Sequence, residues 1–308
     1  MNRYQPFLMI FPITILFSLK SEYYSQPLSN SNNSPNFIFI LADDQGWNGT
    51  SVQMMNSEPL SKSDYHYTPN LEILAQRGIR FSNAYASAPV CAPSRAGLLT
   101  GRYQQSFGFW DNIGPFRVSK EVEPGIPLDI PILSERLKEL GYVCGLFGKT
   151  HEGDSEEMMA FNRWNEFFGF NNGASNYLPG MNRDHNPIFH NKKIINRSYE
   201  KSGISRDEIN QKGVLQIDRQ QYLTDLIADY TLSFIEENRK RPFLCYLPFN
   251  AIHGPFQAPK DLYEKYASEK NHQRRLNMAM LDSMDHNIGR VLNKLKKLDL
   301  EEDTLVIF

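Results

Sequence analysis

Apolar runs of strand length alternate along this chain with helix-length segments that carry one apolar face. The runs are continuously apolar, which is typical of strands that a sheet buries on both faces. They lie at 36–42, 142–147, 243–249 and 304–308. The helical segments lie at 68–78, 132–140, 222–238 and 274–298. This order predicts an α/β fold, with a mostly parallel or mixed central sheet and helices on both faces.

The region 153–213 is rich in Asn, Gly and Arg and lacks a clear period. We predict loops and short elements over the sheet there, a common place for residues that set specificity. Thr68 and Pro69 are predicted to begin the first helix, as N-cap and first helical residue. Cys144 and Cys245 lie within apolar runs and are predicted to be free, buried thiols, although a disulfide between them stays open.

The N-terminus has the pattern of a secretory signal peptide. Arg3 precedes an apolar run at 7–19, and a polar stretch rich in Ser and Asn follows. The run is too short to cross a bilayer comfortably, so stable membrane insertion is not expected, although an uncleaved anchor stays open as the alternative. We therefore expect a signal peptide at 1–25, a polar linker at 26–35 and a secreted, periplasmic or lysosomal/extracellular protein.

The charge balance gives no indication of a polyanionic partner. Lys and Arg number 33 against 35 Asp and Glu, which is a net charge of −2. A nucleic-acid-binding surface needs an excess of basic residues, so nucleic acid is not an expected partner.

Polar side chains follow three of the apolar runs, where the functional site of a parallel sheet usually lies. Asp43 and Asp44 follow the first run, and two adjacent carboxylates at a strand end favour a hard divalent cation over a solvated turn. Lys149 and His151 follow the second run, and His253 follows the third. We therefore expect these side chains to meet at one edge of the sheet.

The sequence at 91–95 is Cys-Ala-Pro-Ser-Arg. The alternative interpretation of this stretch alone is a turn into a helix with a packed cysteine. Taken with the strand-end residues, it resembles the signature of the type I sulfatases, and the resemblance runs from about residue 35 to 308. The resemblance also includes stretches that are less directly tied to the chemistry, at 67–71, 101–105 and 253–259. Within the family, the chain looks most like the arylsulfatase and N-acetylgalactosamine-sulfatase branch.

The resemblance implies that Cys91 is converted after translation to formylglycine by a maturation enzyme that reads the Cys-x-Pro-x-Arg pattern. The hydrated aldehyde is then the implied nucleophile. Asp43, Asp44 and the modified Cys91 are implied to bind Ca²⁺, with Mg²⁺ as the alternative ion. Arg95 is implied to hold the diol and to offset its charge.

The same resemblance implies how sulfate is held and released. Lys149 is implied to bind sulfate oxygens, and His151 to take a proton from the second hydroxyl so that sulfate leaves. His253 is implied to contact the sulfate ester and help protonate the leaving alcohol, and Ser175 is a further candidate for a sulfate contact. The implied function is hydrolysis of sulfate esters of carbohydrate, with aryl sulfate esters as artificial substrates. The alternatives are a phosphatase or phosphodiesterase of the same superfamily and an inactive, truncated sulfatase-like protein.

The resemblance also predicts an alkaline-phosphatase-like sulfatase fold that continues beyond this sequence. The family normally carries Thr/Ser-Asp-Asn-Gly, or a close variant, after the last strand, where it completes the metal site. A later Lys binds sulfate, and a smaller C-terminal subdomain follows. We therefore expect 36–308 to be the N-terminal part of a sulfatase catalytic domain, incomplete and with the C-terminal subdomain missing.

Overall fold

A computed structural model of the chain describes residues 34–112, 125–153, 158–179, 187–195, 212–215, 217 and 219–308. The predicted signal peptide at 1–25 and most of the predicted linker lie outside these residues. Within them, no helix is both long enough and apolar enough to cross a membrane.

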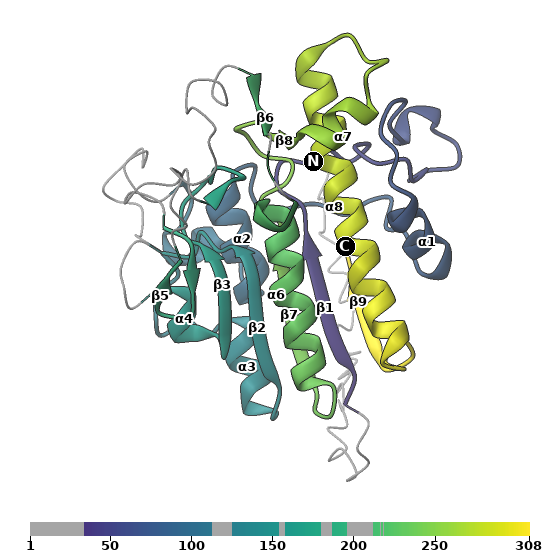
Figure 1. Cartoon of the computed structure of the whole chain (residues 1–308). Coiled ribbons are helices and arrows are strands. Elements are labelled where there is room, and N and C mark those ends of the chain that lie inside the picture. The colour runs from purple at the N-terminus through teal and green to yellow at the C-terminus, as the bar shows by residue number, and fades with distance from the viewer. Residues whose placement is uncertain are drawn as a thin grey trace, which may run out of the picture. The chain divides into compact units, whose positions relative to one another are not determined.

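A seven-stranded sheet forms the centre of the described part of the chain, in the order β5-β4-β3-β2-β7-β1-β9 (Figure 1). Five of its strands are parallel: β1 (Asn36–Leu41), β2 (Val143–Lys149), β3 (Glu166–Phe170), β7 (Phe243–Pro248) and β9 (Thr304–Ile307). Two short antiparallel strands, β4 (Phe189–His190) and β5 (Lys193–Ile194), extend one edge. This mostly parallel, mixed sheet confirms the predicted fold class.

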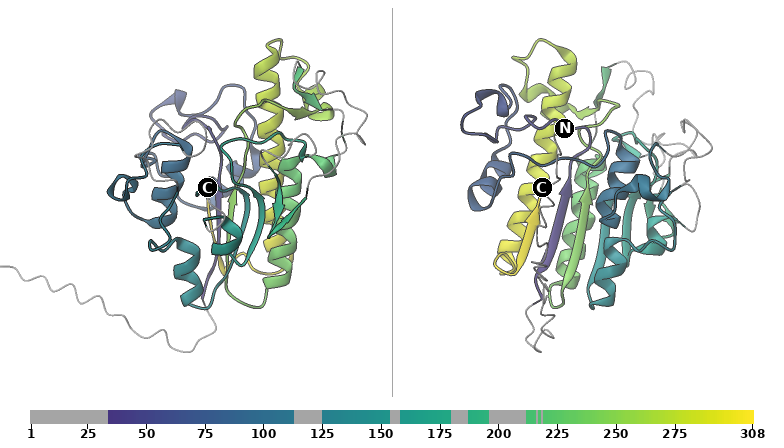
Figure 2. Two further views of the ribbon diagram at one scale, coloured as in Figure 1. Left: turned by 90° about the vertical axis from the view of Figure 1, so that its left-hand side faces the viewer. Right: turned by 180° about the vertical axis from the view of Figure 1, so that it is seen from behind.

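Helices cover both faces of the sheet (Figures 1 and 2). α6 (Leu223–Asn238) and α8 (His272–Lys297) pack on one face, whereas α2 (Cys91–Thr100) and α3 (Leu133–Glu139) pack on the other. Shorter elements among the described residues are α1 (Pro69–Arg77), α4 (Ala160–Arg163), α7 (Lys260–Lys265), a small sheet of β6 (Val214–Leu215) and β8 (Ala258–Pro259), and 3-10 turns at Pro59–Ser61, Gln104–Phe107 and Arg219–Gln221. The predicted helices correspond to α1, α3, α6 and α8.

The parallel strands contribute to two hydrophobic cores, one on each face of the sheet. Ile38 and Ile40 of β1 belong to the core that includes α6 and α8, whereas Phe37 and Phe39 pack on the core that includes α2. Successive side chains of a strand point to opposite faces, so a strand covered on both faces must be apolar throughout. This explains the continuous apolar runs of β1, β2 and β7. The run at 304–308 departs from the expectation, because β9 lies at the edge of the sheet and its Leu305 and Ile307 are exposed.

Cys144 and Cys245 are buried free thiols, as the sequence predicted. Cys144 belongs to the core on the α2 face, and Cys245 belongs to the core on the α6 face. The disulfide that stayed open is therefore not formed, because the two side chains lie on opposite sides of the sheet. Burial raises the pKa of Cys144 to about 11 and raises that of Cys245 further, so neither thiol is reactive.

The prediction of only loops and short elements at 153–213 is incomplete, because this region contains β3. β3 pairs in parallel with β2 over five residues, from Gly145 opposite Glu166 to Lys149 opposite Phe170. Its aromatic side chains are buried, so β3 is a full member of the central sheet.

The start of α1 differs in detail from the prediction. Thr68 precedes the helix, but its hydroxyl accepts from the backbone N–H of Ser51 at 3.0 Å instead of capping the helix. The carboxylate of Asp285 in α8 accepts from the backbone N–H groups of Asn70 and Leu71 at 3.1 and 2.9 Å. A carboxylate at a helix N-terminus is also favoured by the helix dipole. The cap thus comes from a residue more than 200 positions away.

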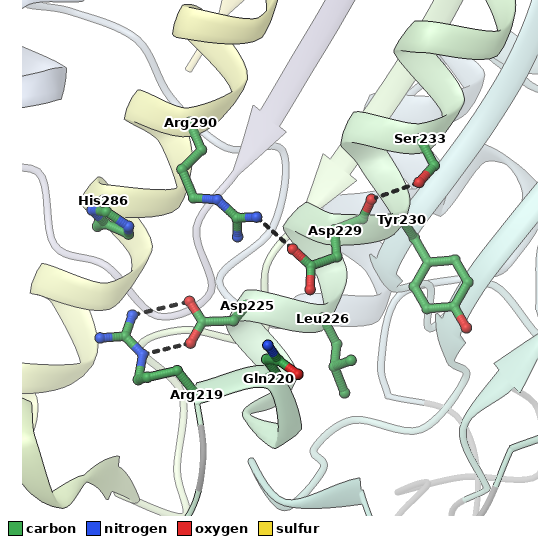
Figure 3. Close-up of a pocket in the computed structure, with 9 residues that line it drawn as sticks. All are labelled: Arg219, Gln220, Asp225, Leu226, Asp229, Tyr230, Ser233, His286 and Arg290. Atoms are coloured by element: carbon green, nitrogen blue, oxygen red, sulfur yellow. Dashed lines mark hydrogen bonds and ion pairs between the residues drawn. The ribbon is translucent and has the colours of Figure 1, made fainter.

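Charged side chains join α6 to α8 along the hollow shown in Figure 3. Arg219 donates to the Asp225 carboxylate at 2.6 and 3.0 Å, and Asn287 of α8 donates to the same carboxylate at 2.6 Å. Arg290 of α8 donates to Asp229 of α6. Because these charges are paired with one another, we assign the hollow to the packing of the two helices.

We expect Asp225→Ala to lower the free energy of unfolding by about 2 kcal/mol, because buried donors lose their acceptor. The Asp225 side chain is 7 % exposed, whereas that of Asp229 is 42 % exposed. Asp229→Ala should therefore cost less than about 1 kcal/mol. Urea unfolding of the two variants measures the difference, and equal losses would contradict it.

Candidate active site

The polar residues at the strand ends meet at one edge of the sheet. β7 lies between β1 and β2, and the three strands run parallel. The backbone N–H of Asp43 donates to the carbonyl of Ala251 at 2.9 Å, and the carbonyl of Asp43 accepts from Ile252 at 2.9 Å. These two bonds fix Asp43 against the loop that carries His253.

One buried carboxylate holds two cations. Nζ of Lys149 lies 2.6 Å from Oδ2 of Asp43, and Nη2 of Arg95 lies 3.3 Å from Oδ1. Nη1 of Arg95 also donates to the carbonyl oxygen of Lys149 at 2.7 Å. Burial raises the pKa of Asp43, but Arg95 and Lys149 lower it more, so it lies below its ordinary value. Two cations and one anion leave positive charge that suits an oxyanion.

α2 presents Cys91 and Arg95 to this cluster. Cys91 is the first residue of the helix, and Arg95 lies one turn further on, so both share a face. Pro93 is tolerated because N–H groups in the first helical turn have no acceptor within the helix. Gly101 ends the helix in the left-handed conformation with φ of +63°.

Cys91 and His151 are in direct contact in the described site. Sγ of Cys91 lies 3.2 Å from Nδ1 of His151 and 3.4 Å from Oδ1 of Asn112. His151 has φ of +55°, a conformation that is uncommon for residues other than glycine and that clusters at functional sites. Burial, with Lys149 and Arg95, lowers the pKa of His151 to about 3. At neutral pH the imidazole is therefore uncharged and able to accept a proton.

His253 and Asp44 lie at the more exposed part of the site. Nε2 of His253 is 3.5 Å from Oδ2 of Asp44, and their side chains are 25 % and 65 % exposed. Nδ1 of His253 donates to the carbonyl of Gly254 at 2.6 Å, so Nε2 is the atom that faces Asp44. Asp44 has φ of +55°, which turns the chain directly after Asp43. The two adjacent aspartates therefore lie in different environments, one buried and one exposed.

Ser175 is buried beneath the loop that carries His253. Its hydroxyl donates to the carbonyl of Asn176 at 3.2 Å, and its carbonyl accepts from the side chain of Asn250 at 3.0 Å. These bonds support the loop after β7. The contact between Ser175 and sulfate stays a prediction.

Sequence reasoning missed two residues that shape the site. Asn112 contacts Cys91, and the hydroxyl of Tyr177 lies 2.8 and 2.9 Å from the carbonyl oxygens of Asn250 and His253. Neither residue follows a predicted strand or belongs to a spaced motif. Their place in the site depends on the three-dimensional path of their loops, which the sequence pattern does not indicate.

The oxygen ligands at this edge of the sheet are of the kind that a hard divalent cation binds, but they are too few to hold one. Asp43 and Asp44 offer carboxylate oxygens, which Ca²⁺ and Mg²⁺ prefer. Both oxygens of Asp43 already face Lys149 and Arg95. Within the described residues, no group of three or more His, Cys, Asp or Glu side chains is arranged to hold a metal ion. These residues alone therefore do not make a complete metal centre.

Comparisons with known proteins identify the family of the chain. A sequence profile of the family described as Sulfatase matches residues 35–308. N-acetylgalactosamine-6-sulfatase of Homo sapiens is 30 % identical over 287 residues, which cover 91 % of this chain and 50 % of that protein. Arylsulfatase J of Mus musculus is 28 % identical over 297 residues, which cover 94 % and 45 %. The crystal structure of Ps i-CgsB in complex with k-i-k-neocarrahexaose matches with a TM-score of 0.73 and 30 % identity, and the match covers 89 % of this chain and 57 % of that one. The chain thus spans about half the length of the curated relatives it matches.

Proposed function

Because the chain belongs to the sulfatase family, we propose that it hydrolyses sulfate esters of carbohydrate. The observation that carries the proposal is the pair of Cys91 and His151, 3.2 Å apart, beside the positively charged cluster around Asp43. A nucleophile, a base and anion-binding charge are then within reach of one sulfate group. Carbohydrate is supported by the relatives, since one is named for N-acetylgalactosamine and another was solved with a neocarrahexaose. Aryl sulfate esters are the proposed artificial substrates.

The proposed nucleophile is formylglycine, made from Cys91 by a maturation enzyme. One hydroxyl oxygen of the hydrated aldehyde loses its proton and attacks sulfur, and a new S–O bond forms as the bond from sulfur to the alcohol oxygen breaks. The proton lost by the attacking hydroxyl balances the one that the leaving alcohol takes up. The leaving alcohol takes up a proton, which we assign to His253 because its ring is partly exposed at the mouth of the site. The product of this step is a sulfate ester of the diol.

The second step releases sulfate without attack on sulfur. His151 takes the proton of the second hydroxyl, the C=O bond of the aldehyde re-forms, and the C–O bond to sulfate breaks. One water molecule then adds to the aldehyde and restores the diol. The neutral state of the buried His151 imidazole supports this role. Lys149 is proposed to hold sulfate oxygens and Arg95 to hold the diol and offset its charge, and Ser175 stays a candidate for a further sulfate contact.

We also propose that Asp43 and Asp44 contribute ligands to a divalent-cation site, with Ca²⁺ preferred over Mg²⁺. When bound, the cation would offset negative charge on the diol and the sulfate. A secreted, periplasmic or lysosomal/extracellular location is proposed from the signal-peptide pattern at 1–25. Such a route would bring the unfolded chain to a maturation enzyme.

The test uses the complete polypeptide, produced with and without a formylglycine-generating enzyme and assayed on p-nitrophenyl sulfate and p-nitrophenyl phosphate. We expect sulfate ester hydrolysis only in the converted preparation, with conversion measured by the mass of the peptide that contains Cys91. Hydrolysis of the phosphate ester by unconverted chain would support the phosphatase or phosphodiesterase alternative. A fully converted but inactive preparation would support the inactive sulfatase-like alternative.

A further inference from the structure

Glu152 is a buried acid that no step above uses. It directly follows His151, and its side chain is among the charged groups that the fold encloses, with 1 % of the residue exposed. Among the described residues, neither carboxyl oxygen makes a hydrogen bond of regular geometry. Burying an acid in this way costs free energy, so a specific environment must tolerate it.

The side chains around Glu152 carry unused hydrogen-bond donors. Among the described residues, Nη1 of Arg163, Nε1 of Trp164 and the hydroxyl of Tyr246 also make no hydrogen bond of regular geometry. The ring of Trp164 stacks on that of Tyr246, with centroids 5.8 Å apart. Trp164, as a hydrogen-bond donor, and Arg163, through its charge, both favour the ionised form of the Glu152 carboxyl. The donors and the carboxyl acceptor are therefore complementary in kind.

Glu152 also completes a row of alternating charges that begins in the candidate site. Asp43 pairs with Lys149 and Arg95, Arg95 and Arg163 both act on Glu152, and Arg163 pairs with Glu135 at 2.7 Å. In order, the row is Lys149, Asp43, Arg95, Glu152, Arg163 and Glu135. The Arg95 guanidinium thus interacts electrostatically with Asp43, Glu152 and Tyr246.

We propose that Glu152 is a positioning residue that acts through Arg95 and whose charge sets how strongly the site binds sulfate. The inference rests on the proposed function for the identity of the anion. With Glu152 protonated, Lys149, Asp43 and Arg95 carry a net charge of about +1 next to the bound sulfate, and ionised Glu152 cancels it. A buried charge is poorly screened, so its effect reaches across the guanidinium.

The protonation state of Glu152 depends on the charged groups of each element packed around it. Burial is the largest effect and raises the pKa of Glu152 to about 7, whereas Arg163 of α4 and Arg95 of α2 lower it, and Glu135 of α3 raises it. Ionised Glu152 in turn raises the pKa of Tyr246 of β7, whose hydroxyl stays protonated. As the pH rises through about 7, Glu152 loses its proton and the site loses attraction for sulfate.

Calorimetric titration with inorganic sulfate tests the proposal on the complete polypeptide at pH 6 and pH 8. We expect the wild-type affinity for sulfate to fall by about tenfold between the two pH values. Glu152→Gln keeps the shape and removes the ionisation, so its affinity should be the same at both. Glu139→Gln removes a carboxylate that is 66 % exposed on α3 and should retain the wild-type dependence.

A second variant tests the proposal even where Glu152→Gln fails to fold. Trp164→Phe keeps Glu152 but removes a donor that favours its charged form, so the fall in sulfate affinity should move to higher pH. A pH dependence of sulfate binding that is unchanged in both variants would overturn the role of Glu152 alone. Failure of every preparation, wild type included, to bind sulfate would overturn the proposed function as well.

Discussion

Cys91→Ala is expected to reduce sulfate ester hydrolysis by about 10⁴-fold or more, because removing a nucleophile leaves only binding and charge stabilisation. The fold should survive the change, since Cys91 is only partly buried at the first position of α2 and its Sγ contacts His151 and Asn112. The measurement is kcat/KM on p-nitrophenyl sulfate, together with sulfate affinity by calorimetry. We expect kcat/KM to fall by this factor and the sulfate affinity to change little.

Cys144→Ala is the matched control for this experiment. It makes the same chemical change at a thiol that is fully buried in the core on the α2 face. Its effect should be a loss of about 1 kcal/mol in the free energy of unfolding, with activity close to that of the wild type. Retention of activity in Cys91→Ala would remove Cys91 from the reaction, and an equal loss in both variants would point to folding as the cause.

The fold was largely predictable from sequence because three of the parallel strands, β1, β2 and β7, are covered on both faces. Their continuous apolar runs and the helices between them leave few arrangements other than a parallel α/β sheet. β3 was missed because its five residues lie within an Asn- and Gly-rich region, where the apolar signal is short. The cap of α1 by Asp285 was also beyond sequence reasoning, because it depends on how α8 packs against α1.

The meeting of Asp43, Lys149 and His253 was predictable for a similar reason: the carboxyl ends of neighbouring parallel strands share one edge. The burial of Glu152 was not predictable, because a glutamate two residues from the start of a loop is usually exposed at the surface. Its surroundings include Arg163, the last residue of α4, and Trp164, which follows that helix and precedes β3. Sequence patterns show which residues are neighbours along the chain, whereas the surroundings of Glu152 come from separate segments that the fold brings together.

Asp43→Ala is expected to lower the free energy of unfolding by about 3–5 kcal/mol, because it leaves two buried cations without their shared carboxylate. Lys149 is 0 % exposed and Arg95 is 2 % exposed, so water cannot replace that partner without opening the core. Asp44→Ala is the matched control, since the adjacent carboxylate is 65 % exposed and should contribute within about 0.5 kcal/mol. Urea unfolding measures both, and similar losses in the two variants would refute the distinction.

The pH dependence of stability offers an independent check on the same carboxylate. The pKa of Asp43 in the folded protein lies below its ordinary value of 3.8, so its pairing stabilises the fold above the pKa of the unfolded chain. That contribution is lost as the pH falls through the lower, folded pKa. Wild-type protein should therefore lose stability faster than Asp43→Ala as the pH is lowered below about 4. Parallel stability curves for the two proteins in this range would mean that Asp43 is not the paired carboxylate that the geometry indicates.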